Sequence, residues 1–215
     1  MKRLTKASLR TALNLLFFTV IATAILSFTY SVTHDLIAQS EDAAKLKLIN
    51  QVVPAVLYDN DLVNDTINLP ANPQLGTTQE TIAYRGLLHG QPSVVVLESI
   101  APDGYSGKIS MIVAINYSGV ITGVRVVTHK ETPGLGDYID IAKNKWINLF
   151  ANTSHERFRE EDWKAKKDGG QFDYMAGATI TPRAVVKAVN KALHYFEENR
   201  DKLFVINTRN KEATP

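Results

Sequence analysis

Residues 168–183 hold the side chains best suited to chemistry, and they lead directly into an amphipathic segment. Thr181 has the type of a helix N-cap and Pro182 the type of a first helical residue, so we expect a helix to begin there. Free backbone N–H groups and the positive end of the helix dipole favour an anion at such a start. Gly177 and Ala178 leave room for a bulky group just before it. The pattern fits phosphate binding, but without further context such a loop is usually only a helix cap without a ligand.

Residues 173–179, Asp-Tyr-Met-Ala-Gly-Ala-Thr, resemble the flavinylation motif Asp-x-x-(Ser/Thr)-Gly-Ala-Thr of the RnfG and NqrC families. The resemblance implies that Thr179 bears FMN through a phosphoester. One position departs from the motif, because Ala176 stands where Ser or Thr is usual. With the N-terminal apolar span the resemblance covers most of the chain, and its longer blocks resemble RnfG more than NqrC. These further blocks are residues 101–107, 128–137 and 167–170.

The resemblance also implies a separate flavin transferase that activates the Thr179 hydroxyl and takes the FMN moiety from FAD, since a threonine hydroxyl is a poor nucleophile unaided. Thr179 is then a tether, and no residue of the chain is catalytic. Linkage through the phosphate leaves the isoalloxazine ring free for one-electron and two-electron chemistry. The residues expected to bind the cofactor are Thr179, Gly177, Ala178, Thr181, Tyr105, Glu131, Thr132, Gly134 and Leu135.

Two parts of this set allow a second interpretation. The run 131–136 contains Gly and Pro, and it is either a wall of the flavin site or a tight turn after a strand. Tyr105 lies between Gly104 and Ser106, and it either stacks on the flavin ring or packs in the core or at its rim.

Other redox and metal chemistry has little support in the composition. The chain has no cysteine, which excludes disulfides, thiolate-bound iron–sulfur clusters and cysteine nucleophiles. We also expect no metal site, because the five histidines show no paired ligand spacing: His34, His89, His129, His155 and His194. The net charge of +2 gives no reason to expect nucleic-acid binding.

The elements that position these residues begin with an apolar segment. Residues 11–33 carry no charged side chain and would form a helix about 34 Å long, enough to cross a hydrocarbon core of about 30 Å. A cleaved signal peptide ending at residues 22–24 is the alternative. Lys2, Arg3, Lys6 and Arg10 precede the span, so the positive-inside rule places the N-terminus in the cytoplasm. Because the span contains no Asp, Glu, Lys, Arg or His, we expect it to anchor the chain and not to conduct ions.

Beyond the span we expect an α+β fold. Apolar residues recur at helical spacing up to Pro54, and strands are expected over 81–88, 93–100, 108–117 and 120–127, followed by helices over 138–150 and after Thr181. Such an order favours a largely antiparallel sheet packed by helices, with 108–117 as a central strand. The predicted organisation is a basic cytoplasmic N-terminus (1–10), a transmembrane helix (11–33), a helical stalk (34–54) and an extracytoplasmic FMN-binding domain (55–215).

The function implied by the resemblance is that of a membrane-anchored flavoprotein subunit of an Rnf-type ion-translocating ferredoxin:NAD oxidoreductase complex. Such a subunit relays electrons through its FMN, while NAD, ferredoxin and iron–sulfur sites belong to partner subunits. It would reside in the inner membrane with its domain in the periplasm. Two alternatives are an NqrC-like subunit of a sodium-translocating NADH:quinone reductase and a membrane-tethered flavin-binding or phosphate-binding module without redox turnover.

Overall fold

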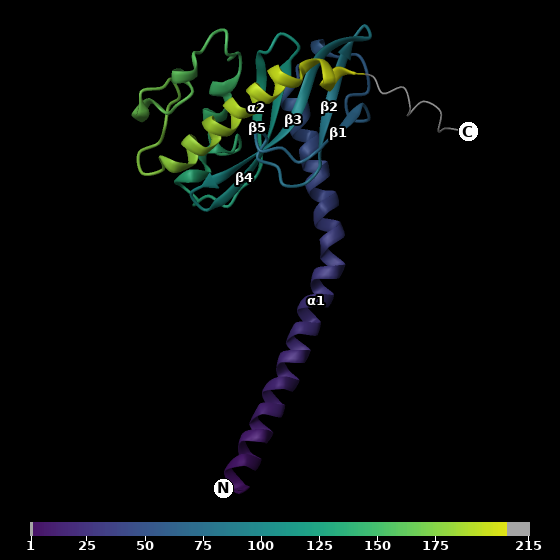
Figure 1. Ribbon diagram of the computed structural model, residues 1–215, viewed down its shortest axis with the longest axis vertical. Coiled ribbons are helices and arrows are strands. Elements are labelled where there is room, and N and C mark those ends of the chain that lie inside the picture. Colours follow the sequence, from purple (N-terminus) through teal and green to yellow (C-terminus); the bar gives the residue numbers. More distant parts are fainter. Residues whose placement is uncertain (1, 206–215) are drawn as a thin grey trace, which may run out of the picture. The chain divides into compact units, whose positions relative to one another are not determined.

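Figure 1 shows a computed structural model of the chain, which describes residues 2–205. The side chains of residues 2–8 and 34–46 lie outside this description, including those of Lys2, Arg3, Lys6 and the first part of the predicted stalk. So do residues 206–215 of the predicted domain. The chain divides into two compact units, one ending at Ala44 and the other beginning at Lys45.

The first element is helix α1 (Lys2–Val52), which contains a predominantly apolar stretch over Leu9–Thr33. This stretch is long and apolar enough to cross a membrane. The hydroxyl groups of Thr19, Ser31 and Thr33 donate to backbone carbonyls of the preceding turn, as in the 2.8 Å hydrogen bond from Thr19 Oγ1 to the carbonyl of Leu15. The helix ends before Pro54, which cannot donate a backbone hydrogen bond.

The second unit is built on one five-stranded antiparallel sheet with the strand order β1-β2-β3-β4-β5. Its strands are β1 (Thr66–Leu69), β2 (Thr81–Leu88), β3 (Gln91–Gly104), β4 (Gly107–Asn116) and β5 (Ile121–Thr128). All four predicted strands are present, and the predicted α+β class is confirmed. The four-residue β1, at one edge of the sheet, was not among the predicted strands, because it lies in a stretch rich in Asn, Asp and Pro that is typical of a loop or an irregular edge.

Both faces of the sheet are covered, and β4 is central as predicted. One face of β4 (Ile109, Met111, Val113 and Ile115) packs in the larger hydrophobic cluster beneath helix α2 (Ile180–Phe204). Its other face (Ile112 and Ala114) packs with Ile49, Val52 and Val53 from the end of α1 and the residue after it. Figure 1 shows α2 running across the strands. The sheet and α2 therefore form a rigid base for the loops at the start of α2.

The region predicted as one helix over 138–150 is instead two 3₁₀ helices, η2 (Gly136–Ile139) and η3 (Lys145–Phe150). The side chain of Asn144 accepts a 2.9 Å hydrogen bond from the Trp146 N–H, so it caps a new helical start inside the predicted helix. Leu149 is exposed, whereas Trp146, Ile147 and Phe150 of η3 are buried. The remaining short 3₁₀ helices are η1 (Ala55–Leu57), η4 (Glu160–Asp162) and η5 (Lys166–Asp168).

Candidate functional site

A cavity of about 280 Å³ lies where three segments of the second unit meet. The turn between β3 and β4, the loop after β5 and the first residues of α2 each contribute to its wall. Of the nine residues predicted to bind the cofactor, all except Gly134 line this cavity. Gly136 and Ile180 were not in the predicted set; each directly follows a predicted residue in the chain. The lining residues are Tyr105, Glu131, Thr132, Leu135, Gly136, Gly177, Ala178, Thr179, Ile180 and Thr181.

The start of α2 differs from the prediction by two residues. Thr179 is the N-cap and Ile180 the first helical residue, whereas Thr181 and Pro182 were expected in these roles. The Thr181 hydroxyl is buried and is used elsewhere, because it donates a 2.5 Å hydrogen bond to Glu131 Oε2. Pro182 is tolerated in the first turn, where backbone N–H groups have no partner within the helix. The Thr179 side chain makes no capping hydrogen bond and is half-buried, so its hydroxyl is not committed to the helix.

The loop before Thr179 is fixed by its backbone. Gly177 has a φ of +89°, a conformation that side chains disfavour. The Asp173 carbonyl accepts a 2.6 Å hydrogen bond from the Trp146 indole, and the Met175 N–H donates to the Tyr138 hydroxyl at 3.4 Å. Burial raises the pKa of Tyr138 to about 12, so this hydroxyl stays protonated at neutral pH. These contacts hold the motif against the core.

Glu131 connects all three segments of the site. The residue is only 4% exposed, and its Oε1 accepts a 3.1 Å hydrogen bond from the Ser106 N–H. Oε2 accepts the bond from Thr181. A side chain at Gly136 would place a Cβ 2.7 Å from Glu131 Oε2 and 2.9 Å from Thr181 Oγ1, so a larger residue here would displace this pair. The buried carboxylate is thus stabilised by two donors, as a buried charge requires.

The loop after β5 fits both interpretations of residues 131–136, because part of it lines the cavity and part of it forms a tight turn. The Gly134 N–H donates to Asp137 Oδ1 at 2.8 Å with a φ of +77°, so for Gly134 the tight-turn interpretation fits best. Thr132 and Leu135 from the same loop line the cavity. Leu135 is 45% exposed and Tyr105 is 67% exposed, so Tyr105 does not fill the core. Together these two side chains give the mouth of the cavity an apolar rim.

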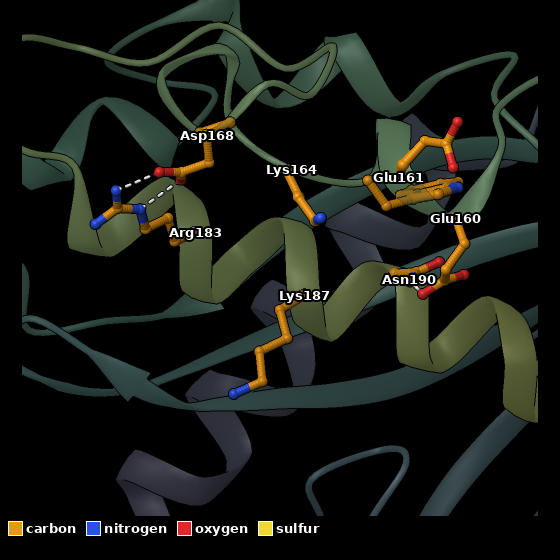
Figure 2. A pocket seen from close by; sticks show the side chains of 9 residues that line it. Glu160, Glu161, Lys164, Asp168, Arg183, Lys187 and Asn190 are labelled. Atoms are coloured by element: carbon orange, nitrogen blue, oxygen red, sulfur yellow. Dashed lines mark hydrogen bonds and ion pairs between the residues drawn. The ribbon is translucent and has the colours of Figure 1, made fainter.

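A charged surface flanks the first turns of α2. Arg183 Nε donates to Asp168 Oδ2 at 2.6 Å, and the hydrogen bonds from Arg183 hold the pKa of Asp168 below its usual value. The pair ties η5 to α2. Figure 2 shows it at one end of a second cavity, of about 480 Å³, whose wall includes Glu160, Lys164 and Asn190. This larger cavity contains none of the predicted cofactor-binding residues.

Comparisons with known proteins agree with the geometry. The family described as FMN-binding domain matches residues 104–194, and the one described as RnfG N-terminal region matches residues 1–52. A protein of Aliivibrio fischeri (strain MJ11), named as the G subunit of the ion-translocating oxidoreductase complex, is 43% identical over 197 residues, covering 92% of this chain and 94% of the relative.

Two further relatives carry the same name. The protein of Vibrio cholerae serotype O1 (strain ATCC 39541) is 42% identical over 194 residues, covering 90% of this chain and 92% of its own. That of Pseudomonas aeruginosa (strain UCBPP-PA14) is 42% identical over 198 residues and 92% of each chain. Because such identity extends over nearly the whole length, the chain belongs to the RnfG family, the G subunits of ion-translocating oxidoreductase complexes.

Proposed function

We propose that this protein is the membrane-anchored electron-carrying subunit of an ion-translocating oxidoreductase complex, with FMN bound through a phosphoester to Thr179. The observation that carries the proposal is the position of Thr179. Its hydroxyl makes no capping hydrogen bond, it stands at the N-terminus of a 25-residue helix, and it lines a cavity in the FMN-binding domain.

The residues around Thr179 fit an FMN phosphate. The first backbone N–H groups of α2, including those of Ile180 and Thr181, have no acceptor within the helix and favour an anion together with the helix dipole. The one carboxylate that lines the cavity, Glu131, already accepts hydrogen bonds from Ser106 and Thr181. Its charge is therefore partly offset before an anion arrives.

The rest of the cofactor would lie toward the rim. A volume of about 280 Å³ is at the lower limit of ligand pockets, which are typically about 300–1,000 Å³. We therefore expect the ring to extend past Tyr105 and Leu135, whose exposed apolar surfaces suit contact with an aromatic face. FMN held there supplies one-electron and two-electron transfer. A ring at the surface is accessible to a redox partner in another subunit.

Attachment requires a flavin transferase. In the expected reaction the Thr179 hydroxyl oxygen forms a bond to the FMN phosphorus of FAD, the pyrophosphate bond breaks, and AMP leaves. A base of the transferase takes the hydroxyl proton. The motif is accessible to such an enzyme, because Asp173, Tyr174 and Ala176 are exposed.

The sequence supports a specific membrane arrangement for this proposal. The stretch Leu9–Thr33 would anchor the chain in the inner membrane, with the basic N-terminus in the cytoplasm and the second unit in the periplasm. Because the chain has no cysteine, single introduced cysteines test this orientation cleanly. A membrane-impermeant thiol reagent added to spheroplasts should label Ser118→Cys and leave Thr5→Cys unlabelled. The reverse pattern would contradict the orientation.

The attachment is tested by co-expressing the full-length chain with a flavin transferase and measuring in-gel flavin fluorescence after denaturation. We expect fluorescence in the unmodified chain and in Thr132→Val, which removes another hydroxyl from the same cavity. Thr179→Val should have none. Fluorescence that persists in Thr179→Val would overturn the proposed linkage. Covalent flavin that partner subunits in native membranes never reduce would instead favour the non-redox alternative.

A further inference from the structure

A second group of side chains, which could act as metal ligands, lies on α2 and the segments packed against it, away from the cavity at Thr179. His155, Glu160 and His194 each offer one ligand atom, and these atoms all lie within 4.8 Å of one another. None of the three lines the first cavity. His194 is fifteen residues beyond Thr179 on α2, or about 22 Å at about 1.5 Å per residue. The group is therefore a separate feature.

His155 is held as a metal-binding histidine usually is. Its side chain is only 17% exposed, and its Nδ1 lies 2.8 Å from Glu197 Oε2. A carboxylate on one ring nitrogen fixes the orientation of a ligating histidine and leaves the other nitrogen for the metal. That other nitrogen, Nε2, lies 2.7 Å from the amide oxygen of Asn190, an atom that a cation can displace or retain as an oxygen ligand.

The other two ligands are exposed and adjustable. His194 Nε2 lies 3.0 Å from Glu160 Oε2, and the side chains are 41% and 68% exposed, respectively. The other carboxylate oxygen of Glu160, Oε1, accepts a 2.8 Å hydrogen bond from the Asn190 amide. Ligand atoms of a tetrahedral zinc site are about 3.4 Å apart. The 4.8 Å limit exceeds that spacing, so binding requires the exposed His194 and Glu160 side chains to move toward His155.

Charge and access also suit a divalent cation. Two carboxylates, those of Glu160 and Glu197, contact the two imidazoles and balance a charge of +2. Glu160 and Asn190 lie side by side at the end of the larger cavity opposite the Asp168–Arg183 pair, as Figure 2 shows. This cavity gives a hydrated ion a route to the cluster. Two imidazoles and one carboxylate favour borderline transition metals over Mg²⁺ or Ca²⁺, which take oxygen ligands.

We propose that His155, Glu160 and His194 bind one divalent transition-metal ion of the Zn²⁺ class, with Glu197 orienting His155. The bound ion links the loop that carries His155, and the following η4, to helix α2. No spacing in the sequence indicates this site, because its ligands come from a loop, a 3₁₀ helix and an α-helix that meet only in the folded chain.

The test is Zn²⁺ titration calorimetry on the full-length protein in detergent, purified without a histidine tag, with Co²⁺ absorption as a second probe. We expect one ion per chain and Co²⁺ bands typical of low coordination number. His194→Ala and Glu160→Gln alter exposed side chains and should weaken binding at least about 100-fold, and Glu197→Gln about 10–100-fold. His89→Ala is the matched control, since its imidazole is exposed and lies outside the cluster.

Loss of binding confined to the cluster variants, with unchanged circular dichroism, supports the proposal. Zn²⁺ should also raise the thermal midpoint of the unmodified chain and of His89→Ala but not that of His194→Ala. Absence of a saturable site, or affinities within about threefold of one another in all variants, would overturn it. Neither readout depends on flavin, so this result stands apart from the test of Thr179.

Discussion

The hydrogen bond between Glu131 and Thr181 is the contact that joins the loop after β5 to the start of α2, and its strength can be measured. Glu131 is 4% exposed and Thr181 is 1% exposed, and their oxygens are 2.5 Å apart. Thr181→Val leaves a buried carboxylate oxygen without a donor, and Glu131→Leu leaves a buried hydroxyl without an acceptor. Each should cost about 1.5–3 kcal/mol of unfolding free energy.

The double variant distinguishes this contact from two independent defects. Because replacing both partners by apolar groups leaves nothing unpaired between them, the double variant should cost at least about 1.5 kcal/mol less than the sum of the single variants. Urea unfolding of the flavin-free chain in detergent, followed by tryptophan fluorescence, gives these values. Trp146 and Trp163 both lie in the second unit, so the signal reports on that unit. Additivity within about 0.5 kcal/mol would refute the coupling.

Three further predictions concern the framework of the site. Gly177→Ala should lower the unfolding free energy by about 1–2 kcal/mol, because a φ of +89° is a strained backbone conformation for any residue with a Cβ. The same variant should slow flavin attachment in a timed transferase assay. Asp168 has a lowered folded pKa through Arg183, so its pairing contributes stability above the unfolded carboxyl pKa of about 3.9 and loses it as the pH falls through the folded value. The thermal midpoints of the unmodified chain and Asp168→Asn should therefore converge on acidification; a constant gap would contradict this. Ile112→Ala should cost about 2–5 kcal/mol in urea unfolding because Ile112 is fully buried, whereas Ile82→Ala, at 39% exposure, should cost under about 1 kcal/mol.

The sequence predicted the fold best where hydrophobic pattern and burial agree. The apolar character of residues 108–117 on both faces indicated a central strand, and β4 is covered on both sides. The pattern failed over 138–150, where apolar residues at helical spacing are interrupted by the Asn144 cap. Periodicity alone does not reveal such a cap, because a side chain's bond to a nearby N–H competes locally with helix propagation.

The sequence could predict those residues of the candidate site that are close to one another in the chain. Gly177, Ala178 and Thr179 are consecutive, and their motif marked the start of a helix. The exact start was wrong, because the partner of Thr181 is Glu131, fifty residues away. The cluster of His155, Glu160 and His194 escaped prediction for the same reason: only the packing of a loop on α2 brings these side chains together.

The central claim, FMN on the Thr179 oxygen, is tested most directly by mapping the modified peptide. Trypsin should release residues 168–183, which contain both Thr179 and Thr181. Tandem mass spectrometry of this peptide from protein co-expressed with the transferase should locate one FMN, less one water, on Thr179. The same adduct on Thr181, or an unmodified peptide from protein that retains covalent flavin elsewhere, would contradict the claim.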